Sequence, residues 1–316
     1  MNQPKDWPDR ILIIKLSALG NVVLSLGPFA AIRAHHPEAE IAVLTTPPYA
    51  GWLAGAPWFD LVLSDGRPPW WDLPRVMRLR AALRAGRFDR VYDLQTSGRS
   101  SRYFTFFPRA ERPEWCGIAP GCSHPHRMAA GTGVHDIDRQ YAQLAVAGIT
   151  ARASVDLSWS TADLSRFGLR ARIALLIPGS SAHRPDKRWP ASRYGELARW
   201  LVDRGIVPVV AGTRGEAPLA AAIRTMVPAA IDLTGRTTLA ELTELTRVAV
   251  VAVGNDTGPM HLAAAAGCAS VVLFSKDSDP ALCAPRGRWV RTLRESDLAA
   301  LPLIAVTELL GPVVGG

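Results

Sequence analysis

The chain has 316 residues, of which 48% are hydrophobic and 20% are charged, which is enough for two domains with cores of their own. No apolar run approaches the roughly 18 residues that a membrane-spanning helix needs, and the first ten residues, MNQPKDWPDR, lack the apolar segment of a signal peptide. These features disfavour a membrane-spanning or secreted protein, and we expect a globular protein in the cytoplasm.

The net charge of +8 is concentrated in one stretch, residues 67–112. Eleven arginines and four acidic residues in this stretch account for seven of the eight net positive charges. Such a stretch favours an anionic partner, which is a phosphorylated substrate, a membrane surface or nucleic acid. A solvated, arginine-rich helix face is the alternative interpretation.

In chain order, the first half alternates β-branched apolar runs with segments of helical periodicity. The spacing predicts strands at 10–16, 41–46, 60–64 and 89–95, and helices at 21–35, 73–85 and 135–147. Alternation of this kind is typical of a parallel sheet that is covered by helices on both faces.

The second half repeats this pattern. It predicts strands at 173–180, 207–212, 230–235, 248–255, 270–275 and 289–293, and helices at 190–204, 215–226, 238–247 and 258–267. The polar stretch 158–172 is the expected joint. We therefore predict an α/β protein with two doubly wound, Rossmann-like domains, 1–160 and 161–316, that face each other across a cleft. Ligands of such sheets bind beyond the carboxyl ends of the strands.

The first predicted strand runs into KLSALGNVVLSLGP, residues 15–28, with Asn21 at the start of a helix. A helix start presents free N–H groups to a ligand. The asparagine amide can donate and accept hydrogen bonds, but it cannot take a proton from a substrate near neutral pH. The segment therefore either binds a ligand or belongs to a catalytic site that has lost its general base.

The strongest local signal is VAVGNDTGPMHLAAAAG, residues 251–267. A buried strand ends here, Thr257 can cap a helix, and Pro259 falls in the first turn, where its missing N–H costs little. The backbone N–H groups of this turn suit a diphosphate. A well-capped core helix is the alternative, although it explains Asp256 and His261 less well.

Two further strand ends carry polar groups. The loop PGSSAHRPDKRWP lets the backbone near Ser180 approach a ligand, while Lys187 and Arg188 supply positive charge for phosphate oxygens. It lacks the G-x-x-x-x-G-K-[ST] spacing of a Walker loop. In the segment AGTRGEAP, Glu216 either accepts hydrogen bonds from ribose hydroxyls or is an acid at a helix start. Amides, a cation and a carboxylate at three strand ends predict a nucleotide-diphosphate site.

Four segments carry a likeness to a known family: ILIIKLSALGN, YDLQTSGRSSRY, PGSSAHRPDKRWP and GNDTGPMHLAAAAGCASVVLFSKDSDP. They resemble glycosyltransferase family 9, the ADP-heptose:lipopolysaccharide heptosyltransferases, and the resemblance covers nearly the whole chain. It implies a GT-B fold whose C-terminal domain holds an ADP-sugar and whose N-terminal domain holds the lipopolysaccharide-core acceptor. It also implies inverting transfer that requires no metal, and we expect no cofactor.

The predicted site has a donor half and an acceptor half. By the family's motifs, Lys187 corresponds to the lysine that binds the diphosphate, and Glu216 to the residue that binds ribose. The full set of predicted donor-binding residues is Ser180, Ser181, Lys187, Glu216, Asp256, Thr257, Gly258 and His261. The predicted acceptor-binding residues are Ser17, Gly20, Gln95, Arg99 and Arg102.

The chain departs from the family pattern at Gly20 and Asn21, where heptosyltransferases usually have Gly-Asp. That aspartate is regarded as the family's general base, so Asn21 occupies the position of the base. A milder departure is LFSKDSDP, which replaces a glycine-containing LFG turn and predicts a donor loop of different shape.

Three replacements for the base are open. Asp93 lies near the end of the fourth predicted strand, with a structural role as its alternative. His124 and His126 lie in a predicted loop at 116–126, and histidine titrates near working pH. Asp136 begins a predicted helix, where charging of the helix start is the favoured role.

The loop 116–126 also holds Cys116 and Cys122 beside the two histidines. The spacing C-x5-C-x-H-x-H fits no usual zinc finger, whose paired cysteines are two to four residues apart. We therefore predict no metal site. With Cys268 and Cys283, these cysteines are expected to be free thiols.

In the basic stretch, residues 67–90 join a loop rich in proline and tryptophan to a predicted helix. Trp70 and Trp71 either approach lipid or a sugar face or pack in the core, and the arginines are available to phosphates and carboxylates. The periodicity puts four apolar residues on the inner side of the helix: Val76, Met77, Leu79 and Leu83.

Together these observations favour an inverting, metal-independent glycosyltransferase that moves a heptose or related sugar from an ADP-sugar to an anionic lipopolysaccharide-core acceptor. We expect peripheral contact with the cytoplasmic face of the inner membrane and no nucleic-acid partner, because no recognition motif accompanies the charge. The alternative is a catalytically impaired nucleotide-sugar-binding protein that kept the donor site but lost its base at Asn21. A nicotinamide-dependent oxidoreductase is disfavoured because no G-x-G-x-x-G turn follows either domain's first strand.

Overall fold

The computed structural model of the protein covers most of the chain. It describes residues 8–127, 133–169, 171–180 and 188–315. Two predicted donor-binding residues, Ser181 and Lys187, lie outside the described residues. The chain divides between Val155 and Asp156 into two compact units, called here the N-terminal and C-terminal units.

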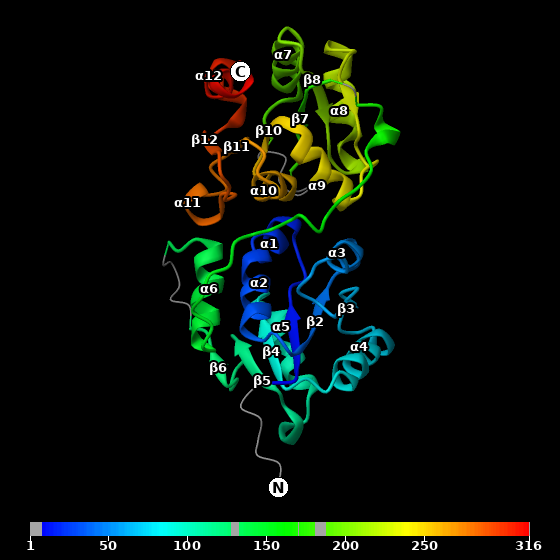
Figure 1. Ribbon diagram of the computed structural model, residues 1–316, viewed down its shortest axis with the longest axis vertical. Coiled ribbons are helices and arrows are strands. Elements are labelled where there is room, and N and C mark those ends of the chain that lie inside the picture. The colour runs from blue at the N-terminus through cyan, green and yellow to red at the C-terminus, as the bar shows by residue number, and fades with distance from the viewer. Residues whose placement is uncertain (1–7, 128–132, 170, 181–187, 316) are drawn as a thin grey trace. The chain divides into compact units, whose positions relative to one another are not determined.

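The N-terminal unit is built on a six-stranded parallel sheet (Figure 1). Its strands are β1 (Arg10–Ile14), β2 (Glu40–Thr45), β3 (Leu61–Ser64), β4 (Arg90–Asp93), β5 (Glu114–Gly117) and β6 (His124–Pro125). Their order is β3-β2-β1-β4-β5-β6, so the chain moves outward from β1 to β3 and then crosses back to add β4 beside β1. The prediction of a loop at 116–126 was wrong at both ends, where residues 116–117 of β5 pair with residues 124–125 of β6. Strands of four and two residues are too short to show a periodicity.

Six α-helices accompany this sheet in the described part of the unit. They are α1 (Leu19–Val23), α2 (Leu26–His35), α3 (Pro47–Leu53), α4 (Leu73–Ala85), α5 (Gly98–Tyr103) and α6 (Asp136–Val146). The single helix predicted at 21–35 is interrupted between α1 and α2. Pro28 has no N–H to donate to the carbonyl of Leu24, so the hydrogen-bond ladder cannot continue there.

Both faces of the N-terminal sheet are buried. Alternate residues of β1 point to opposite faces, and Leu12 and Ile14 join a core cluster with Val76 and Leu83 of α4. Ile11, Ile13 and their neighbours on the other face are also fully buried. The prediction for α4 was wrong at Met77, which is 53% exposed.

The C-terminal unit repeats the architecture with a second six-stranded parallel sheet of order β12-β11-β10-β7-β8-β9. Its strands are β7 (Ile173–Ile177), β8 (Val207–Val210), β9 (Ile231–Asp232), β10 (Ala249–Asn255), β11 (Ser270–Phe274) and β12 (Val290–Arg294). Its α-helices in the described residues are α7 (Ala191–Val202), α8 (Ala217–Met226), α9 (Leu239–Val248), α10 (Gly258–Ala265), α11 (Pro280–Cys283) and α12 (Leu303–Val314).

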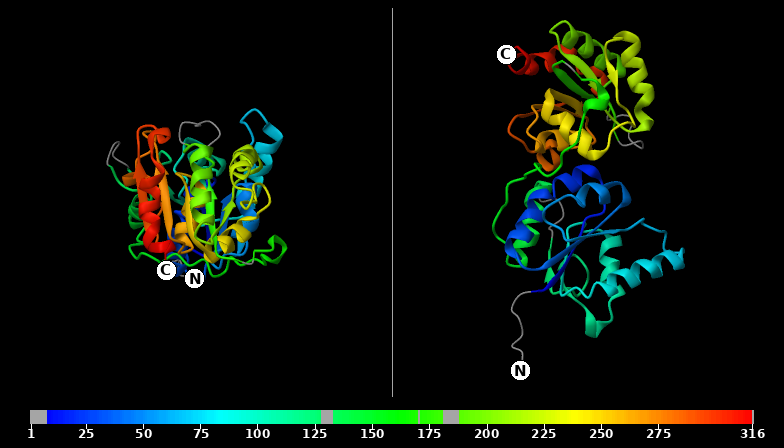
Figure 2. Two further views of the ribbon diagram at one scale, coloured as in Figure 1. Left: turned by 90° about the horizontal axis from the view of Figure 1, so that it is seen from above. Right: turned by 45° about the vertical axis from the view of Figure 1, so that its right-hand side comes forward.

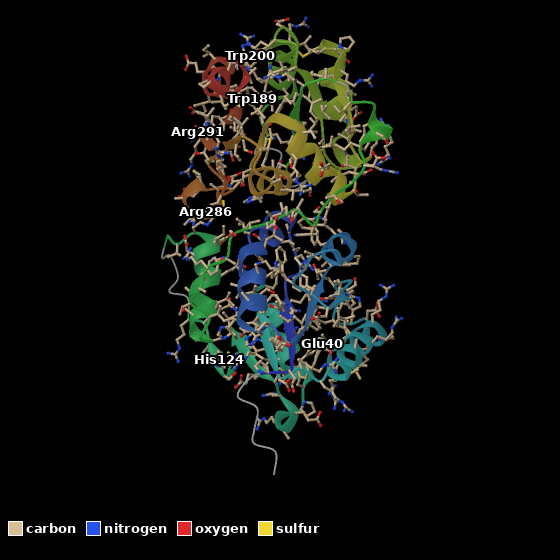
Figure 3. All side chains as sticks on the ribbon, viewed as in Figure 1. Glu40, His124, Trp189, Trp200, Arg286 and Arg291 are labelled. Carbon is tan, nitrogen blue, oxygen red and sulfur yellow. The ribbon has the colours of Figure 1, made fainter. Side chains whose placement is uncertain are left out.

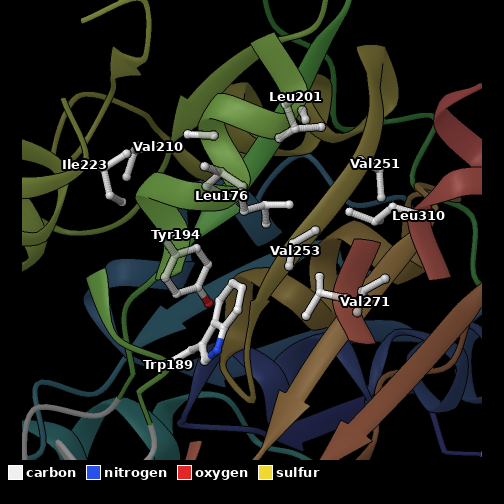
Figure 4. Close-up of a cluster of buried hydrophobic side chains, with 14 of the residues drawn as sticks. Leu176, Trp189, Tyr194, Leu201, Val210, Ile223, Val251, Val253, Val271 and Leu310 are labelled. Carbon is white, nitrogen blue, oxygen red and sulfur yellow. The ribbon is translucent and has the colours of Figure 1, made fainter. Parts of the chain in front are cut away.

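Helices cover both faces of the C-terminal sheet, as the views in Figures 1 and 2 show. Leu176 of β7 packs in a cluster with α7, α8 and α12, whereas Leu175 belongs to a cluster with α9 and α10. Figure 4 shows Trp189 and Tyr194 in the first cluster, with ring centroids 5.0 Å apart and the rings nearly perpendicular. The unit is therefore doubly wound, as predicted.

Each sheet has one point at which the order of strands reverses. It lies between β1 and β4 in the N-terminal unit and between β7 and β10 in the C-terminal unit. In open α/β sheets, the carboxyl ends of the strands at such a switch point form the usual ligand site. Among the helices of the described chain, none combines the length and apolarity needed to cross a membrane.

Candidate functional site

A small polar pocket opens at the switch point of the N-terminal sheet, and we call it the N-terminal pocket. Its walls come from the segments that follow β1, β4 and β6, together with helices α1 and α6. The residues that line it include Lys15, Asn21, Gln95, His126, Asp136 and Arg139. Three of these residues, Asn21, Gln95 and His126, were predicted from the sequence as site residues, and a fourth, Asp136, was considered as a replacement for the base.

Hydrogen bonds of two side chains join the loops after β1 and β4. Gln95 Oε1 accepts hydrogen bonds from the backbone N–H groups of Leu16, at 2.8 Å, and Ser17, at 3.3 Å. Lys15 Nζ donates to the carbonyl of Leu94 at 2.8 Å. These bonds join segments about 79 residues apart in the chain, so the floor of the pocket is formed before any ligand binds.

Asn21 presents an exposed side chain from the short helix α1. Its Nδ2 donates only a long hydrogen bond of 3.4 Å to the carbonyl of Ser17. The Ser17 hydroxyl accepts a hydrogen bond from Arg67 at 3.0 Å, and Gly20 is partly exposed beside Asn21. An amide in this position can orient a hydroxyl group, but it cannot remove its proton.

Lys15 carries the most strongly buried charge of the pocket. Its side chain is 6% exposed, and burial lowers the pKa of Lys15 from 10.5 to about 8, against the opposing effect of the Asp136 and Asp93 carboxylates. An ammonium group with this pKa is charged near neutral pH and loses its proton on mild alkalinisation.

Asp93, a predicted candidate for the base, is 0% exposed and does not line the N-terminal pocket. Its Oδ1 accepts hydrogen bonds from the N–H groups of Gln95, at 3.2 Å, and Thr96, at 3.1 Å. Burial raises the pKa of Asp93 to about 7, although its hydrogen-bond donors and Lys15 act in the opposite direction. A carboxyl group without accessible surface cannot contact an acceptor, which argues against Asp93 as the base and favours its structural role.

The two predicted histidines lie in different environments in the structure. His126 lines the N-terminal pocket, and burial lowers the pKa of its imidazole, with Arg139 acting in the same direction. His124 does not line the pocket; it lies on the edge strand β6, away from α1, as Figure 3 shows, and its Nδ1 contacts the Ser123 hydroxyl at 3.0 Å. The geometry therefore argues against a catalytic role for His124.

The cysteines of this region are engaged in backbone contacts. The Cys116 thiol donates to the carbonyl of Gln143 at 3.2 Å, and the Cys122 thiol to the carbonyl of Gly117 at 3.5 Å. None of the four cysteines, all of which lie in the described ranges, forms a disulfide. Within the described ranges, no group of three or more His, Cys, Asp or Glu side chains could hold a metal ion.

The predicted acceptor-binding arginines lie beside Trp70 and do not line the N-terminal pocket. The guanidinium carbon of Arg99 is 4.8 Å from the centroid of the Trp70 ring, and that of Arg102 is 5.1 Å away. Arg99 also donates to the Tyr103 hydroxyl at 2.8 Å and to the Pro68 carbonyl at 2.6 Å. Arg99 is thus fixed by several partners, whereas Arg102 remains exposed.

In the C-terminal unit, the side chain of Asn255 joins the two strands of the switch point. This fully buried residue ends β10. Its Nδ2 donates to the carbonyls of Pro178, at 2.8 Å, and Gly179, at 3.3 Å, and its Oδ1 accepts from the N–H of Trp189 at 2.9 Å. From the sequence, Asn255 is included only as the last residue of the strand predicted at 248–255, although an amide at the end of the apolar run AVVAVG is a signal for this role.

The predicted donor block follows Asn255 directly. Helix α10 begins at Gly258, and Asp256, Thr257 and Gly258 are all partly exposed at its start. Thr257 is the N-cap residue of α10, as predicted, although its hydroxyl makes no capping hydrogen bond. His261 is buried one turn into α10, with its Nε2 4.0 Å from Asp256 Oδ1.

Glu216 closes the turn that follows β8. Its carboxylate caps the short 3-10 helix η5 (Arg214–Glu216) by accepting hydrogen bonds from the N–H and the hydroxyl of Thr213. The same carboxylate lies against Gly179 and Gly212, where an added Cβ would overlap its oxygens. Glu216 therefore caps this turn through its Oε2, while its Oε1 lies beside the backbone that follows β7.

Ser180, the last described residue of the loop after β7, is buried and held by Arg188. Arg188 Nε donates to the Ser180 hydroxyl at 3.2 Å. Within the C-terminal unit, the ends of β7, β8 and β10 thus gather Ser180, Glu216 and the start of α10. The start of α10 supplies backbone N–H groups, Arg188 a cation and Glu216 a carboxylate, which are the kinds of groups that suit a nucleotide diphosphate.

A family model of glycosyltransferase family 9 (heptosyltransferase) matches residues 76–302, more than half of the chain. The chain belongs to this family. Its matched range includes the C-terminal strand ends and most of the residues that line the N-terminal pocket.

Individual relatives agree with this assignment to glycosyltransferase family 9. The chain is 27% identical over 310 residues to lipopolysaccharide heptosyltransferase 2 of Salmonella typhimurium, covering 90% of this chain and 88% of the relative. It is also similar to the solved structure of Escherichia coli ADP-heptose LPS heptosyltransferase II, with a TM-score of 0.79, 21% identity and coverage of 96% of this chain and 98% of that chain.

A second solved structure, E. coli heptosyltransferase WaaC with ADP-2-deoxy-2-fluoro heptose, gives a TM-score of 0.78 at 21% identity and covers 96% of this chain and 99% of that chain. The two structural likenesses confirm the predicted fold. The protein is an α/β heptosyltransferase-family chain with the two parallel sheets of the GT-B fold.

Proposed function

We propose that the protein is an inverting glycosyltransferase that moves a heptose or related sugar from an ADP-sugar to an anionic lipopolysaccharide-core acceptor. Membership of glycosyltransferase family 9 supports the reaction class. The observation that carries the proposal is the convergence of the β7, β8 and β10 strand ends in the C-terminal unit, where Asn255 fixes the loop after β7 next to the start of α10.

The C-terminal unit holds the donor in this proposal. The N–H groups at the start of α10 face the diphosphate, because a helix N-terminus stabilises negative charge. Asp256, Thr257 and His261 lie around the diphosphate. Glu216 accepts hydrogen bonds from the ribose. Ser181 and Lys187 complete the set by motif, with the Lys187 ammonium on the phosphate oxygens.

The departing diphosphate is stabilised by these amides and cations, so the proposed transfer requires no metal ion and no cofactor. The acceptor oxygen attacks the anomeric carbon of the sugar while the bond from that carbon to the diphosphate breaks, which inverts the configuration. Positive groups directed at a leaving group contribute as much as a general base or more. The names of the relatives support ADP-heptose as the donor to be tested first.

The N-terminal unit binds the acceptor in this proposal. Lys15 and Arg139 give the N-terminal pocket positive charge. Asn21 and Gln95, which line the pocket, contact the acceptor hydroxyl in this proposal, and the adjoining Ser17 and Gly20 contact the rest of the acceptor. Phosphates and carboxylates of a lipopolysaccharide core are anionic, which suits these cations.

An exposed surface of the N-terminal unit supports peripheral contact with an anionic membrane. Trp71 is 84% exposed, Leu73 64% and Met77 53%, all in or beside the start of α4. Exposed arginines, including Arg75 and Arg78, flank them. Apolar side chains beside arginines bind the interface of a bilayer with anionic lipids, so we place the protein at the cytoplasmic face of the inner membrane, where its glycolipid acceptor would lie.

One observation favours a second candidate, a nucleotide-sugar-binding protein with impaired catalysis. Asn21 stands where the family has its aspartate, and an amide cannot act as a base. This alternative predicts binding of ADP without turnover.

Incubation with ADP-heptose and extracted lipopolysaccharide core tests the proposal through release of ADP. We expect acceptor-dependent release that is lost in a Lys187→Ala variant, and calorimetry should give tighter binding of ADP than of UDP or GDP. Binding of ADP without release, at any acceptor concentration, would establish the impaired protein instead.

A further inference from the structure

The N-terminal pocket is lined by a carboxylate, that of Asp136. Asn21 and Asp136 both line this pocket, although they are separated by more than one hundred residues in the chain. We propose that Asp136 is the general base of this protein, which takes the proton from the acceptor hydroxyl in place of the missing aspartate at position 21. This inference rests on the transferase function proposed above.

A buried hydrogen bond brings the two residues to the same pocket. The Ser25 hydroxyl contacts Gln140 Oε1 at 2.7 Å and also the carbonyl of Asn21 at 2.7 Å. Ser25 follows Asn21 by four residues and Gln140 follows Asp136 by four residues, which is about one helical turn in each case. Helices α2 and α6 pack against each other around this contact (Figure 1). Asn21 and Asp136 therefore each lie about one turn before the contact between Ser25 and Gln140, and both line the pocket.

The Asp136 carboxylate is accessible from the pocket, unlike the other candidate bases. Its side chain is 25% exposed, whereas Asp93 is 0% exposed. His126 lines the pocket, but its Nε2 is buried and finds no hydrogen-bond partner among the described residues. Among these groups, Asp136 alone combines a position in the pocket with accessible acidic oxygens.

Two cations interact with the Asp136 carboxylate. Arg139 forms an ion pair with its Oδ1 from one turn further along α6, and the buried Lys15 ammonium lies within electrostatic range. The role of charging the helix start does not explain this arrangement fully, because Asp138 in the same turn of α6 also charges it without lining the pocket.

The proposed step is a displacement at the anomeric carbon with transfer of one proton. The O–H bond of the acceptor hydroxyl breaks and its proton moves to an Asp136 carboxylate oxygen. The hydroxyl oxygen forms a bond to the anomeric carbon of the donor sugar, and the bond from that carbon to the ADP β-phosphate oxygen breaks, so ADP departs with the electron pair. Asn21 orients the hydroxyl through its amide in this step.

An Asp136→Asn variant tests the proposal, with Asp138→Asn as its matched control. Both aspartates lie in the first turn of α6 and each forms an ion pair with an arginine, Arg139 for Asp136 and Arg152 for Asp138. We expect Asp136→Asn to lower kcat by about 10²–10⁴-fold, the usual contribution of a general base, while the Kd for ADP stays unchanged. Asp138→Asn should change kcat by less than about fivefold, since a partly exposed ion pair contributes little.

Restoring the aspartate at position 21 supplies a second test. In the Asp136→Asn background, Asn21→Asp should recover kcat by at least about tenfold, because the carboxylate returns to the same pocket. In the otherwise unchanged protein, Asn21→Asp should change kcat by less than about threefold if a base is already present. A large gain from Asn21→Asp alone would overturn the proposal, even if Asp136→Asn failed to fold.

The outcomes separate this inference from the proposed function. Full turnover by a folded Asp136→Asn variant overturns the base role and leaves the transferase intact. Absence of ADP release by the unaltered protein overturns the proposed transferase function, and with it the proposed role of Asp136 as general base. A drop in kcat that the Asn21→Asp change rescues supports both.

Discussion

The Asn255 amide is hydrogen bonded to the backbone N–H of Trp189 at 2.9 Å, across 66 residues of chain. The same amide donates to the carbonyls of Pro178 and Gly179. A single buried side chain thus holds both ends of the loop 178–189 against the end of β10. The shape of the proposed diphosphate site depends on this contact, because the loop and the start of α10 contribute to it together.

Replacement of Asn255 by leucine should lower the free energy of unfolding by about 3–5 kcal/mol, since each buried polar group left without a partner costs about 1–3 kcal/mol. Urea denaturation of the two proteins measures this loss. The affinity for ADP should fall as well, because the loop after β7 is no longer fixed. An Asn255→Leu variant with unchanged stability and ADP affinity would show that the loop is held by other contacts.

The stability of an Asn255→Asp variant should depend on pH. An ionised aspartate keeps an acceptor for the Trp189 N–H but places a second acceptor against the carbonyls of Pro178 and Gly179, whereas a protonated aspartate can donate to one of them. The stability deficit relative to the unaltered protein should therefore shrink as the pH is lowered. Thermal unfolding between pH 5 and 8 checks the trend, and a deficit independent of pH would contradict it.

Gly179→Ala should displace the Glu216 carboxylate, because the added Cβ would overlap its oxygens. We expect a loss of stability of about 1–3 kcal/mol, as is usual for an overpacked site, together with weaker binding of ADP. In a Glu216→Ala background the same glycine substitution should cost less, since the group it meets is absent. The double-mutant cycle measures this coupling, and additive effects would show that Gly179 and Glu216 do not act on each other.

Asp93→Asn should stabilise the protein at higher pH. The folded-state pKa of about 7 lies above the ordinary value of 3.8, so the folded state binds more protons than the unfolded state between these values, and stability falls as the pH rises from about 4 to about 7. An amide keeps the acceptor for Gln95 and Thr96 without this loss. The gain from Asp93→Asn should therefore be small at pH 4 and larger at pH 8, on the order of 1–4 kcal/mol.

The Asp93→Asn protein also tests the role of this residue in catalysis. Because the carboxyl group has no accessible surface, we expect kcat to stay within about tenfold of the original value, well short of the loss of a general base. A loss of about 10³-fold with ADP binding intact would return Asp93 to the list of candidate bases.

Trp71→Ala should weaken binding to vesicles that contain anionic phospholipid. The side chain is 84% exposed, so its removal leaves the stability of the protein nearly unchanged, whereas a tryptophan at a bilayer interface contributes to binding through its buried apolar area. Ile304→Ala is a matched control, because Ile304 is 60% exposed on α12 of the other unit. Sedimentation with anionic and with neutral vesicles measures the difference, and equal effects of the two substitutions would argue against a specific membrane surface around Trp71.

The sequence by itself determined the class of fold and the position of the donor block. The strands of the C-terminal unit are apolar runs bounded by glycine and polar residues, so their periodicity and their ends are local properties of the chain. The segment VAVGNDTGPMH identifies the end of β10 and the start of α10 for the same reason. By contrast, β5 and β6 are defined by pairing with β4 and with each other, and such short strands carry no local signal.

Only the tertiary structure decided which acidic residue shares a pocket with Asn21. Asp93 follows a strong strand signal and lies near β1 in the topology, yet packing buries it completely. Asp136 reads as an ordinary helix-start acid in the sequence, but the contact between Ser25 and Gln140, 115 residues apart, brings its helix to the N-terminal pocket. Burial and long-range contacts arise from how helices pack on the sheet, and a local pattern of residues does not contain that information.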